Sequence, residues 1–214
     1  MKTSRGLMAS VVLIVVAVAA AAWLYPHLPA QVPTHWDVHD HVDGTMPRLW
    51  AAAFPALALL AVLALSVLAP AISPRQFSIK RFASVWWVLA LTTEAYVLII
   101  GFAVLLKAAG YAAPIPRIAM LAVGVLLLVC GNYTGRLQKN FFIGIRTPWT
   151  LASDAVWERT HRFGGWVFVA GGVGTLIAAV VDPAPWLILA VLVAVFLITV
   201  GYSYYMHLCL EGSR

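Results

Sequence analysis

Charged residues are scarce in this chain. Of its 214 residues only 10% are Asp, Glu, Lys or Arg, against about 25% in soluble domains. Hydrophobic residues make up 63%, and the mean hydropathy is +0.92. A chain of this length cannot bury so much apolar surface in one water-soluble core. The composition therefore excludes an ordinary cytosolic enzyme or a disordered chain, and it indicates an integral membrane protein.

Cysteines and acidic residues are also few. Cys130 and Cys209 are far apart, which excludes a disulfide framework and a cysteine-based metal site. Eight acidic residues stand against 14 Lys and Arg, a net charge of +6. Such an excess can indicate nucleic-acid binding, but in a membrane protein its distribution among the loops has to be considered first.

Long uncharged apolar runs are plentiful. A membrane-spanning helix needs roughly 20 apolar residues, and runs of about that length recur along the chain. They are Leu7–Tyr25, Leu49–Ala71, Phe82–Leu106, Ile118–Tyr133 (extendable back through Pro116), Phe163–Val181 and Trp186–Met206. None alternates as barrel strands do. We therefore expect an all-α integral membrane protein with six transmembrane helices.

Basic residues predict the orientation of these helices. With the N-terminus inside, 11 Lys and Arg residues fall in inner segments and three in outer ones. The inner set is Lys2, Arg5, Arg75, Lys80, Arg81, Arg136, Lys139, Arg146, Arg159, Arg162 and Arg214; the outer set is Arg48, Lys107 and Arg117. This bias places both termini in the cytoplasm. Direct nucleic-acid binding is then not needed to explain the charge.

The first span also fits a secretory signal peptide. A basic start is followed by an apolar run that ends in small residues, 19–22. The run is longer than a usual signal core, however, and Trp23 and Tyr25 extend it as an interfacial anchor would. Length and flanks favour a retained helix.

The outer loop, Pro26–Arg48, is rich in proline, histidine and aspartate. Its prolines exclude a long helix, and Asp43–Gly44 indicates a turn. Imidazole and carboxylate side chains can bind zinc or a similar divalent metal. The candidate ligands are His35, His39 and His41, among the carboxylates Asp37, Asp40 and Asp43. The alternative is a polar loop that only covers the helices; no other cofactor is expected.

The inner loop, Arg136–Arg162, is basic and aromatic in its first part. Gly144 permits a tight bend, and Thr147–Pro148 favours extended backbone before a new element. Ser153 can then cap a short interfacial helix, which we expect to turn into the fifth span at Gly164–Gly165. The alternative is a basic anchor that only fixes topology, for which fewer residues would suffice.

A family resemblance rests on this loop. The segment GNYTGRLQKNFFIGIRTPWTL, 131–151, followed by VWERTHR at 156–162 and a Gly-Gly pair, resembles the signature of the SdpI family. Leu28-Pro, Val32-Pro, His35-Trp36 and Asp43-Gly44 resemble a short domain of unknown function that commonly precedes it. Together these regions cover about half the chain. One departure is Asp40, near which the family often has glycine.

The resemblance implies a non-enzymatic, multi-spanning protein of the bacterial cell membrane that gives immunity to a secreted toxic peptide. Its partners would be membrane lipid, that peptide and, in a signalling member, a cytoplasmic transcriptional repressor. The division it implies is 1–70, a helix pair with the outer loop 26–48, and 71–214, a four-helix region with the signature loop at 134–162. Candidate interaction residues are Asn132, Asn140, Gly144, Arg146, Thr147, Pro148, Trp149, Trp157, Glu158 and His161, with His35, Trp36, Asp43 and Gly44 outside.

Glu94 lies near the middle of the third span. A carboxylate is costly in lipid, so we expect it to face the bundle and to be protonated or paired, for example with Thr92 or Asn132. It could instead serve a small proton-coupled transporter, with metal from the outer loop. That is the alternative function, although no inverted repeat of interrupted helices is visible.

Overall fold

The computed structural model describes residues 3–36, 41–181 and 184–211. Over these residues the chain forms a two-stranded sheet, three short 3-10 turns and seven α-helices. The helices are α1 (Thr3–Leu24), α2 (Arg48–Ile72), α3 (Ala83–Ala108), α4 (Ile115–Thr134), α5 (Pro148–Ala152), α6 (Asp154–Val181) and α7 (Trp186–Glu211). All except α5 are long and apolar enough to cross a membrane. The chain is therefore an all-α, multi-pass membrane protein, as predicted.

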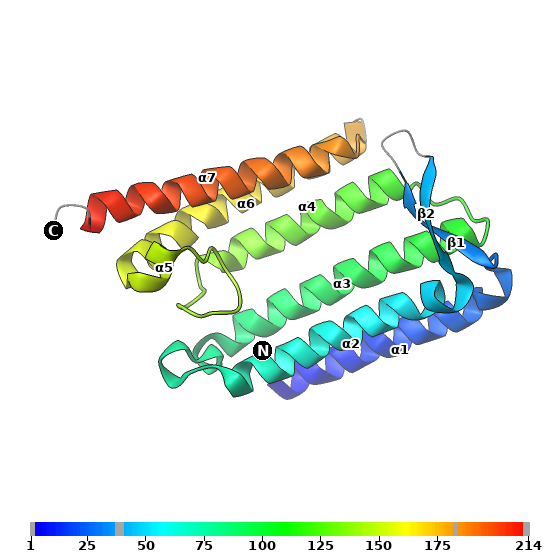
Figure 1. Cartoon of the computed structure of the whole chain (residues 1–214), viewed down its shortest axis with the longest axis horizontal. Helices are drawn as coiled ribbons and strands as arrows, with labels where there is room; N and C mark the ends of the chain where they lie inside the picture. The colour runs from blue at the N-terminus through cyan, green and yellow to red at the C-terminus, as the bar shows by residue number, and fades with distance from the viewer. Residues whose placement is uncertain (1–2, 37–40, 182–183, 212–214) are drawn as a thin grey trace.

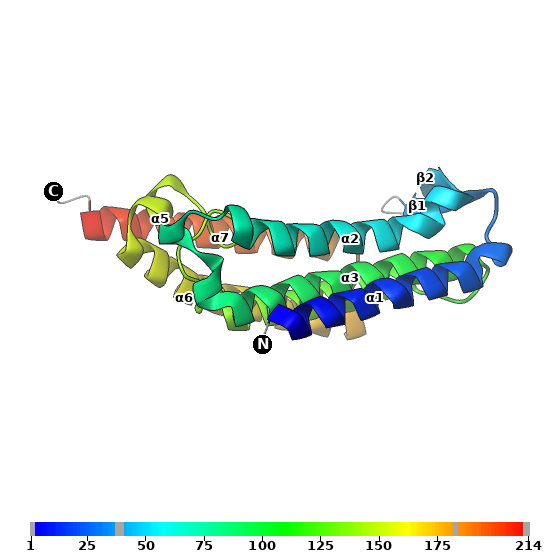
Figure 2. The same ribbon diagram turned by 90° about the horizontal axis from the view of Figure 1, so that it is seen from below.

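The six long helices lie side by side along one axis (Figure 1). α3 packs against α1, α2 and α4, while α6 packs against α4 and α7. Seen from below, α2 and α7 lie on one side of the molecule, and α1, α3 and α6 on the other (Figure 2). The contact of α3 with α4 thus joins the first three long helices to the last three.

The two ends of the bundle differ in what they carry. Both chain ends lie toward the end that also holds α5, and the strands lie at the opposite end (Figure 1). We call the first end, with α5 and residues 135–147, the terminal face, and the second the hairpin face. Which face is cytoplasmic stays a prediction.

The outer loop forms a β-hairpin. Strands β1 (Gln31–Trp36) and β2 (Val42–Pro47) pair antiparallel. The turn predicted at Asp43–Gly44 was wrong, because both residues lie within β2. Gly44 pairs with His35 at an irregularity in register, and a Cβ on Gly44 would come within 2.9 Å of the His35 Cβ. The glycine therefore permits a close cross-strand approach.

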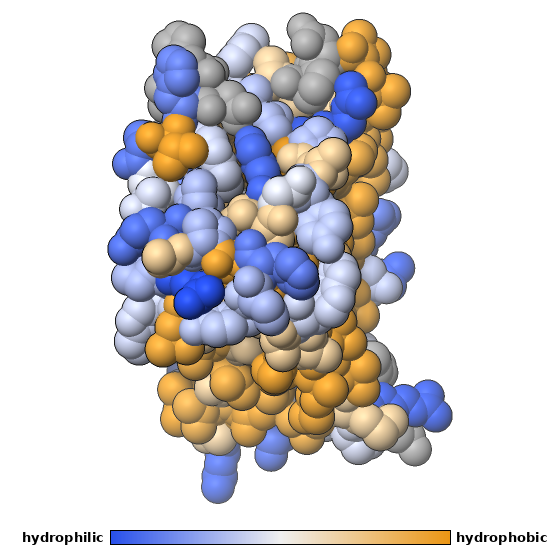
Figure 3. Space-filling model, turned by 90° about the vertical axis from the view of Figure 1, so that its right-hand side faces the viewer, coloured by the Kyte–Doolittle hydropathy of each residue, from blue (hydrophilic) through white to orange (hydrophobic). Residues whose placement is uncertain are grey.

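Each end of the bundle has its own apolar cluster. Val32 of β1 is fully buried and attaches the hairpin to α1, α2 and α3 through Leu24, Ala51 and Leu105. The hairpin face outside this cluster is largely hydrophilic, with hydrophobic residues at its margins (Figure 3). The cluster at the terminal face contains Ala69, Ile79, Phe82, Val85, Trp86, Trp87, Leu137 and Trp157.

The predicted separate interfacial helix was wrong. α6 runs without a break from Asp154 to Val181, through the glycine pair where a turn was expected. A Cβ on Gly165 would lie 2.8 Å from the carbonyl oxygen of Gly131 on α4. The glycine pair therefore serves close helix packing, and the residues expected to form the interfacial helix are the first part of α6 itself.

Candidate functional site

In the structure the signature loop is confined to residues 135–147 at the terminal face, because α5 and α6 take up most of the remainder of 134–162. It is folded around the fully buried side chain of Asn140. Its amide nitrogen donates to the carbonyls of Gln138 at 2.8 Å and Ile143 at 3.2 Å. Its Oδ1 accepts from the backbone N–H groups of Phe142 at 2.8 Å and Ile143 at 2.9 Å. These four hydrogen bonds satisfy backbone groups that no helix or strand pairs. Asn140 thus shapes the loop from within.

His161 of α6 holds the second half of the loop. Its buried Nε2 accepts the backbone N–H of Ile145 at 3.0 Å. Nδ1 therefore carries the ring proton and donates to the Trp157 carbonyl at 2.8 Å. Trp157 stacks on the ring at a centroid distance of 3.9 Å. Gly144, with φ +109°, approaches so closely that a Cβ would lie 2.5 Å from Nε2.

The start of α5 is fixed by a capping box. The Thr147 hydroxyl accepts from the Thr150 N–H at 3.3 Å, and the Thr150 hydroxyl accepts from the Thr147 N–H at 2.8 Å. Pro148 occupies the first helical position, where no N–H is needed. The Trp149 ring nitrogen donates to Ser203 of α7 at 2.9 Å. This hydrogen bond ties α5, and through it the end of the loop, to α7. The backbone of Thr147 is extended, as predicted.

Three other predicted residues, Arg146, Pro148 and Glu158, are exposed at the terminal face. Asn132 is also exposed, on α4, and donates to the carbonyl of Leu128 in its own helix at 2.9 Å. The structure therefore separates the predicted set into residues that shape the loop, most of them buried, and exposed residues whose side chains a partner can reach.

A polar hollow of about 580 Å³ lies between the signature loop and the connection from α2 to α3. An ion pair between Lys139 and Asp154, 2.5 Å apart, borders it. Its other charged residues are Arg81, Arg136 and Glu158. The hollow offers a partner both signs of charge.

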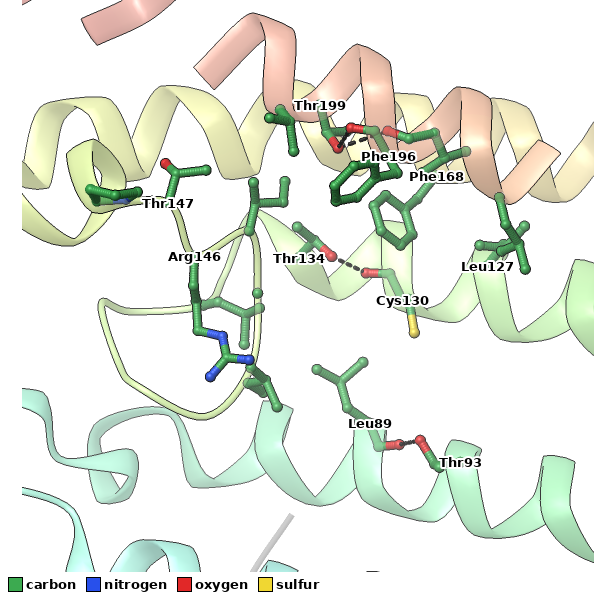
Figure 4. A pocket seen from close by; sticks show the side chains of 18 residues that line it. Leu89, Thr93, Leu127, Cys130, Thr134, Arg146, Thr147, Phe168, Phe196 and Thr199 are labelled. Carbon is green, nitrogen blue, oxygen red and sulfur yellow. Dashed lines mark hydrogen bonds between the residues drawn. The ribbon is translucent and has the colours of Figure 1, made fainter. Parts of the chain in front are cut away.

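A second space, which we call the lateral cavity, has a volume of about 660 Å³. α3, α4, α6, α7 and residues 143–148 line it. In Figure 4, Leu89 and Thr93 on α3 lie across the space from Cys130 on α4, and Arg146 lies at its loop end. The lining comes from five segments far apart in sequence, so sequence patterns gave no sign of it.

Glu94 faces the bundle interior and is fully buried. The polar side chain beside it is Ser10 of α1, which is also fully buried. Neither side chain makes a hydrogen bond of normal geometry within the described part of the chain. The suggested partners Thr92 and Asn132 were wrong, because neither carboxyl oxygen of Glu94 has a hydrogen-bond partner among the described residues, and both side chains donate to carbonyls of their own helices. A signal for Ser10 was its place as a polar residue one turn after Gly6 in an otherwise apolar span.

At the hairpin face, His35 Nδ1 and Asp43 Oδ1 are 2.5 Å apart, and both side chains are exposed. The Lys107 ammonium lies 4.7 Å from the centre of the Trp36 ring. His39, a candidate metal ligand, and its neighbours Asp37 and Asp40 lie outside the described residues. Among the described residues no three His, Cys, Asp or Glu side chains come together as a metal site. Metal binding by His35, His39 and His41 stays a prediction.

Two family models match the chain. The SdpI/YfhL protein family matches residues 136–203, and the domain of unknown function DUF1648 matches residues 12–60. The chain is also similar to "Immunity protein SdpI" of Bacillus subtilis (strain 168), with 28% identity over 210 residues that cover 96% of this chain and 97% of the relative. No solved structure gives a significant match. The matched regions contain the hairpin and the signature loop.

Proposed function

Because the chain belongs to the SdpI family, we propose that it is a membrane immunity protein, which protects a bacterium against a secreted toxic peptide. The observation that carries this proposal is the similarity to an immunity protein over 96% of the chain. The comparisons do not favour the alternative function, a small proton-coupled transporter that uses Glu94. The proposal places the chain in the bacterial cell membrane.

Immunity of this kind needs no covalent step. It needs a surface that binds the peptide or prevents its insertion, and that surface must keep its shape in the membrane. Buried hydrogen bonds from Asn140 and His161 hold the signature loop in one conformation. Arg146 is presented on that loop, Pro148 at the start of α5 and Glu158 in the first part of α6. We assign protection to these exposed residues, with the hairpin as the opposite contact surface.

The test is survival of a sensitive bacterium that expresses the chain and is challenged with the toxic peptide. We expect the chain to raise survival, and Arg146→Ala or Pro148→Ala to reduce it while membrane insertion is preserved. Arg5→Ala, an exposed change on α1, is the control and should leave survival unchanged. If survival is unchanged, and if the chain instead alters a proton or metal gradient and Glu94→Gln abolishes that effect, the chain is the proton-coupled transporter.

We further propose that the polar hollow is where a signalling member would recruit a cytoplasmic transcriptional repressor. Its mixed charges, from Arg81 and Arg136 to Glu158, suit a protein surface better than a single-sign ligand. The measurement is the position of a fluorescently tagged repressor before and after exposure to the peptide. We expect movement to the membrane, which Arg81→Glu, a change in the hollow outside the protective set, prevents without loss of immunity. A repressor that stays in the cytoplasm would leave immunity as the whole function.

A further inference from the structure

The polar side chains in the wall of the lateral cavity are engaged with their own helices. The hydroxyl of Thr93 donates to the Leu89 carbonyl at 3.0 Å, and Thr134 donates to the Cys130 carbonyl at 2.6 Å. On α7, the hydroxyl of Thr199 donates to the carbonyl of Val195 at 2.7 Å, in the same way. These groups turn their donors away from the space, and the rest of the helical wall is apolar. An occupant of this part is therefore apolar.

The cavity opens sideways, toward lipid. Leu192 and Phe196 of α7 line it and are nevertheless 41% and 62% exposed. The α7 wall runs from Leu192 to Val200, a length of about 12 Å at 1.5 Å per residue. One leaflet contributes about 15 Å of the hydrocarbon core. The cavity thus has the depth of a single leaflet, the one next to the terminal face.

The loop end of the cavity carries a positive charge. Arg146 is exposed, and its guanidinium donates to the Phe141 carbonyl through one nitrogen. It forms no salt bridge with any carboxylate in the described ranges. A guanidinium has five N–H donors in a fork that suits phosphate oxygens. Basic sites between helices near a membrane surface are typical of anionic headgroup binding.

We propose that the lateral cavity is a binding site for an anionic phospholipid, with an acyl chain against α3, α4 and α7 and the phosphate at Arg146. A peptide helix is the other apolar occupant to consider. An apolar peptide helix carries no anion for the guanidinium of Arg146, whose remaining N–H donors suit a phosphate. A phospholipid supplies both the apolar chain and the phosphate, and this difference decides for lipid.

The test is lipid retention by the purified full chain in a mild detergent, counted by native mass spectrometry. The probes are dioleoyl phosphatidylglycerol, dioleoyl phosphatidylcholine, dihexanoyl phosphatidylglycerol and inorganic phosphate. We expect one long-chain phosphatidylglycerol to be retained about fivefold more than phosphatidylcholine, as expected for one basic residue near an anionic lipid. The short-chain lipid and free phosphate should not compete.

Arg146→Gln should abolish this preference, while Arg162→Gln, an exposed change on the same face, should leave it intact. Circular dichroism of both variants shows whether each remains folded. Equal retention of the two long-chain lipids by the unsubstituted chain, or a preference that survives Arg146→Gln, overturns the proposal. Competition by free phosphate, or displacement of lipid by an apolar single-span peptide, would overturn it as well.

Discussion

A few polar side chains determine the shape of a largely apolar molecule. Asn140 makes its four hydrogen bonds within three residues of itself, so its effect is local. His161 acts across 16 residues, because it accepts the N–H of Ile145. A buried backbone N–H without a partner costs about 1–3 kcal/mol. Each side chain therefore stabilises a loop that would otherwise leave polar backbone groups unsatisfied.

The first residue-scale prediction concerns Gly144→Ala. The left-handed backbone at φ +109° and the 2.5 Å approach of a Cβ to His161 Nε2 both oppose the substitution. We expect a loss of about 1–3 kcal/mol from the backbone alone, and more from the displaced histidine. Thermal unfolding in detergent should show Tm lowered by roughly 5 °C or more.

Gly110→Ala is the matched control for that change. Gly110 has φ +90° but no atom within 4 Å of a Cβ, so it measures backbone strain alone. Gly144→Ala should therefore lower Tm by more than Gly110→Ala. Equal shifts would mean that the contact with His161 contributes nothing.

The second residue-scale prediction concerns metal at the hairpin. If His35, His39 and His41 bind zinc, calorimetry on the purified chain should show a binding heat that the triple alanine variant loses. His27→Ala changes another exposed histidine near the hairpin and should preserve the heat. An unchanged heat in the triple variant would dismiss the site.

Residue types were easier to predict from the sequence than residue partners. Glu94 was expected to face the bundle, because lipid exposure of a carboxylate is costly, and it is buried. Its neighbour Ser10 lies on another helix, 84 positions away in the chain, and only the packing of α1 on α3 brings them together. The roles of Asn140 and His161 likewise depend on loop geometry that composition does not encode.

At the scale of elements, the contact between α4 and α6 is built from glycines on both helices. A Cβ on Gly131 would lie 2.7 Å from the Gly165 carbonyl oxygen, and one on Gly172 would lie 2.8 Å from that of Gly124. The two pairs are seven residues apart on each helix, so they lie on one face of each. Close backbone approach of this kind is what holds apolar helices together where lipid is equally apolar.

Gly172→Ala should therefore separate α4 from α6. The two nearest atoms that its Cβ would meet, the Gly124 carbonyl oxygen at 2.8 Å and the Leu128 nitrogen at 2.9 Å, are backbone atoms of α4, which cannot rotate away. We expect a destabilisation of about 1–3 kcal/mol, as for other overpacked sites, measured as a lower Tm in detergent. Gly174→Ala is the control on the same helix, because its Cβ would meet nothing within 4 Å. An equal effect of the two substitutions would contradict the packing argument.

The long helices were predictable because hydropathy is a local property of the sequence. Each predicted span overlaps one long helix, although α6 begins nine residues before the predicted fifth span, and Trp186 starts the last helix as expected. The hairpin was not predictable to the same degree, because strand pairing depends on register between distant residues. Asp43–Gly44 resembled a turn, yet the strand includes it, since Gly44 can approach His35 closely. The break expected in α6 failed because glycines in a span more often pack than bend.

On the scale of the whole molecule, α3 and α4 connect two groups of three long helices. The lateral cavity lies at that junction, with walls from α3 on one side and from α4, α6 and α7 on the other. The signature loop closes its end through Ile143, Gly144 and Ile145. A ligand in the cavity therefore contacts both helix groups and the loop. Its binding can change the conformation of the loop at the terminal face.

The orientation of the whole molecule is the last prediction. Nine of the 12 basic residues in the described part of the chain lie in segments that belong to the terminal face, which should therefore be cytoplasmic. Cys209 is exposed on α7 near that face, and Cys130→Ser leaves it as the only thiol. A membrane-impermeant maleimide should label it only after the cells are permeabilised. A cysteine-free background with Thr45→Cys, exposed on β2, should be labelled in intact cells. Labelling of both thiols is measured in intact and in permeabilised cells. The reverse pattern would show that the charge bias predicts the wrong side for the termini, and therefore the wrong side for the face to which a repressor could bind.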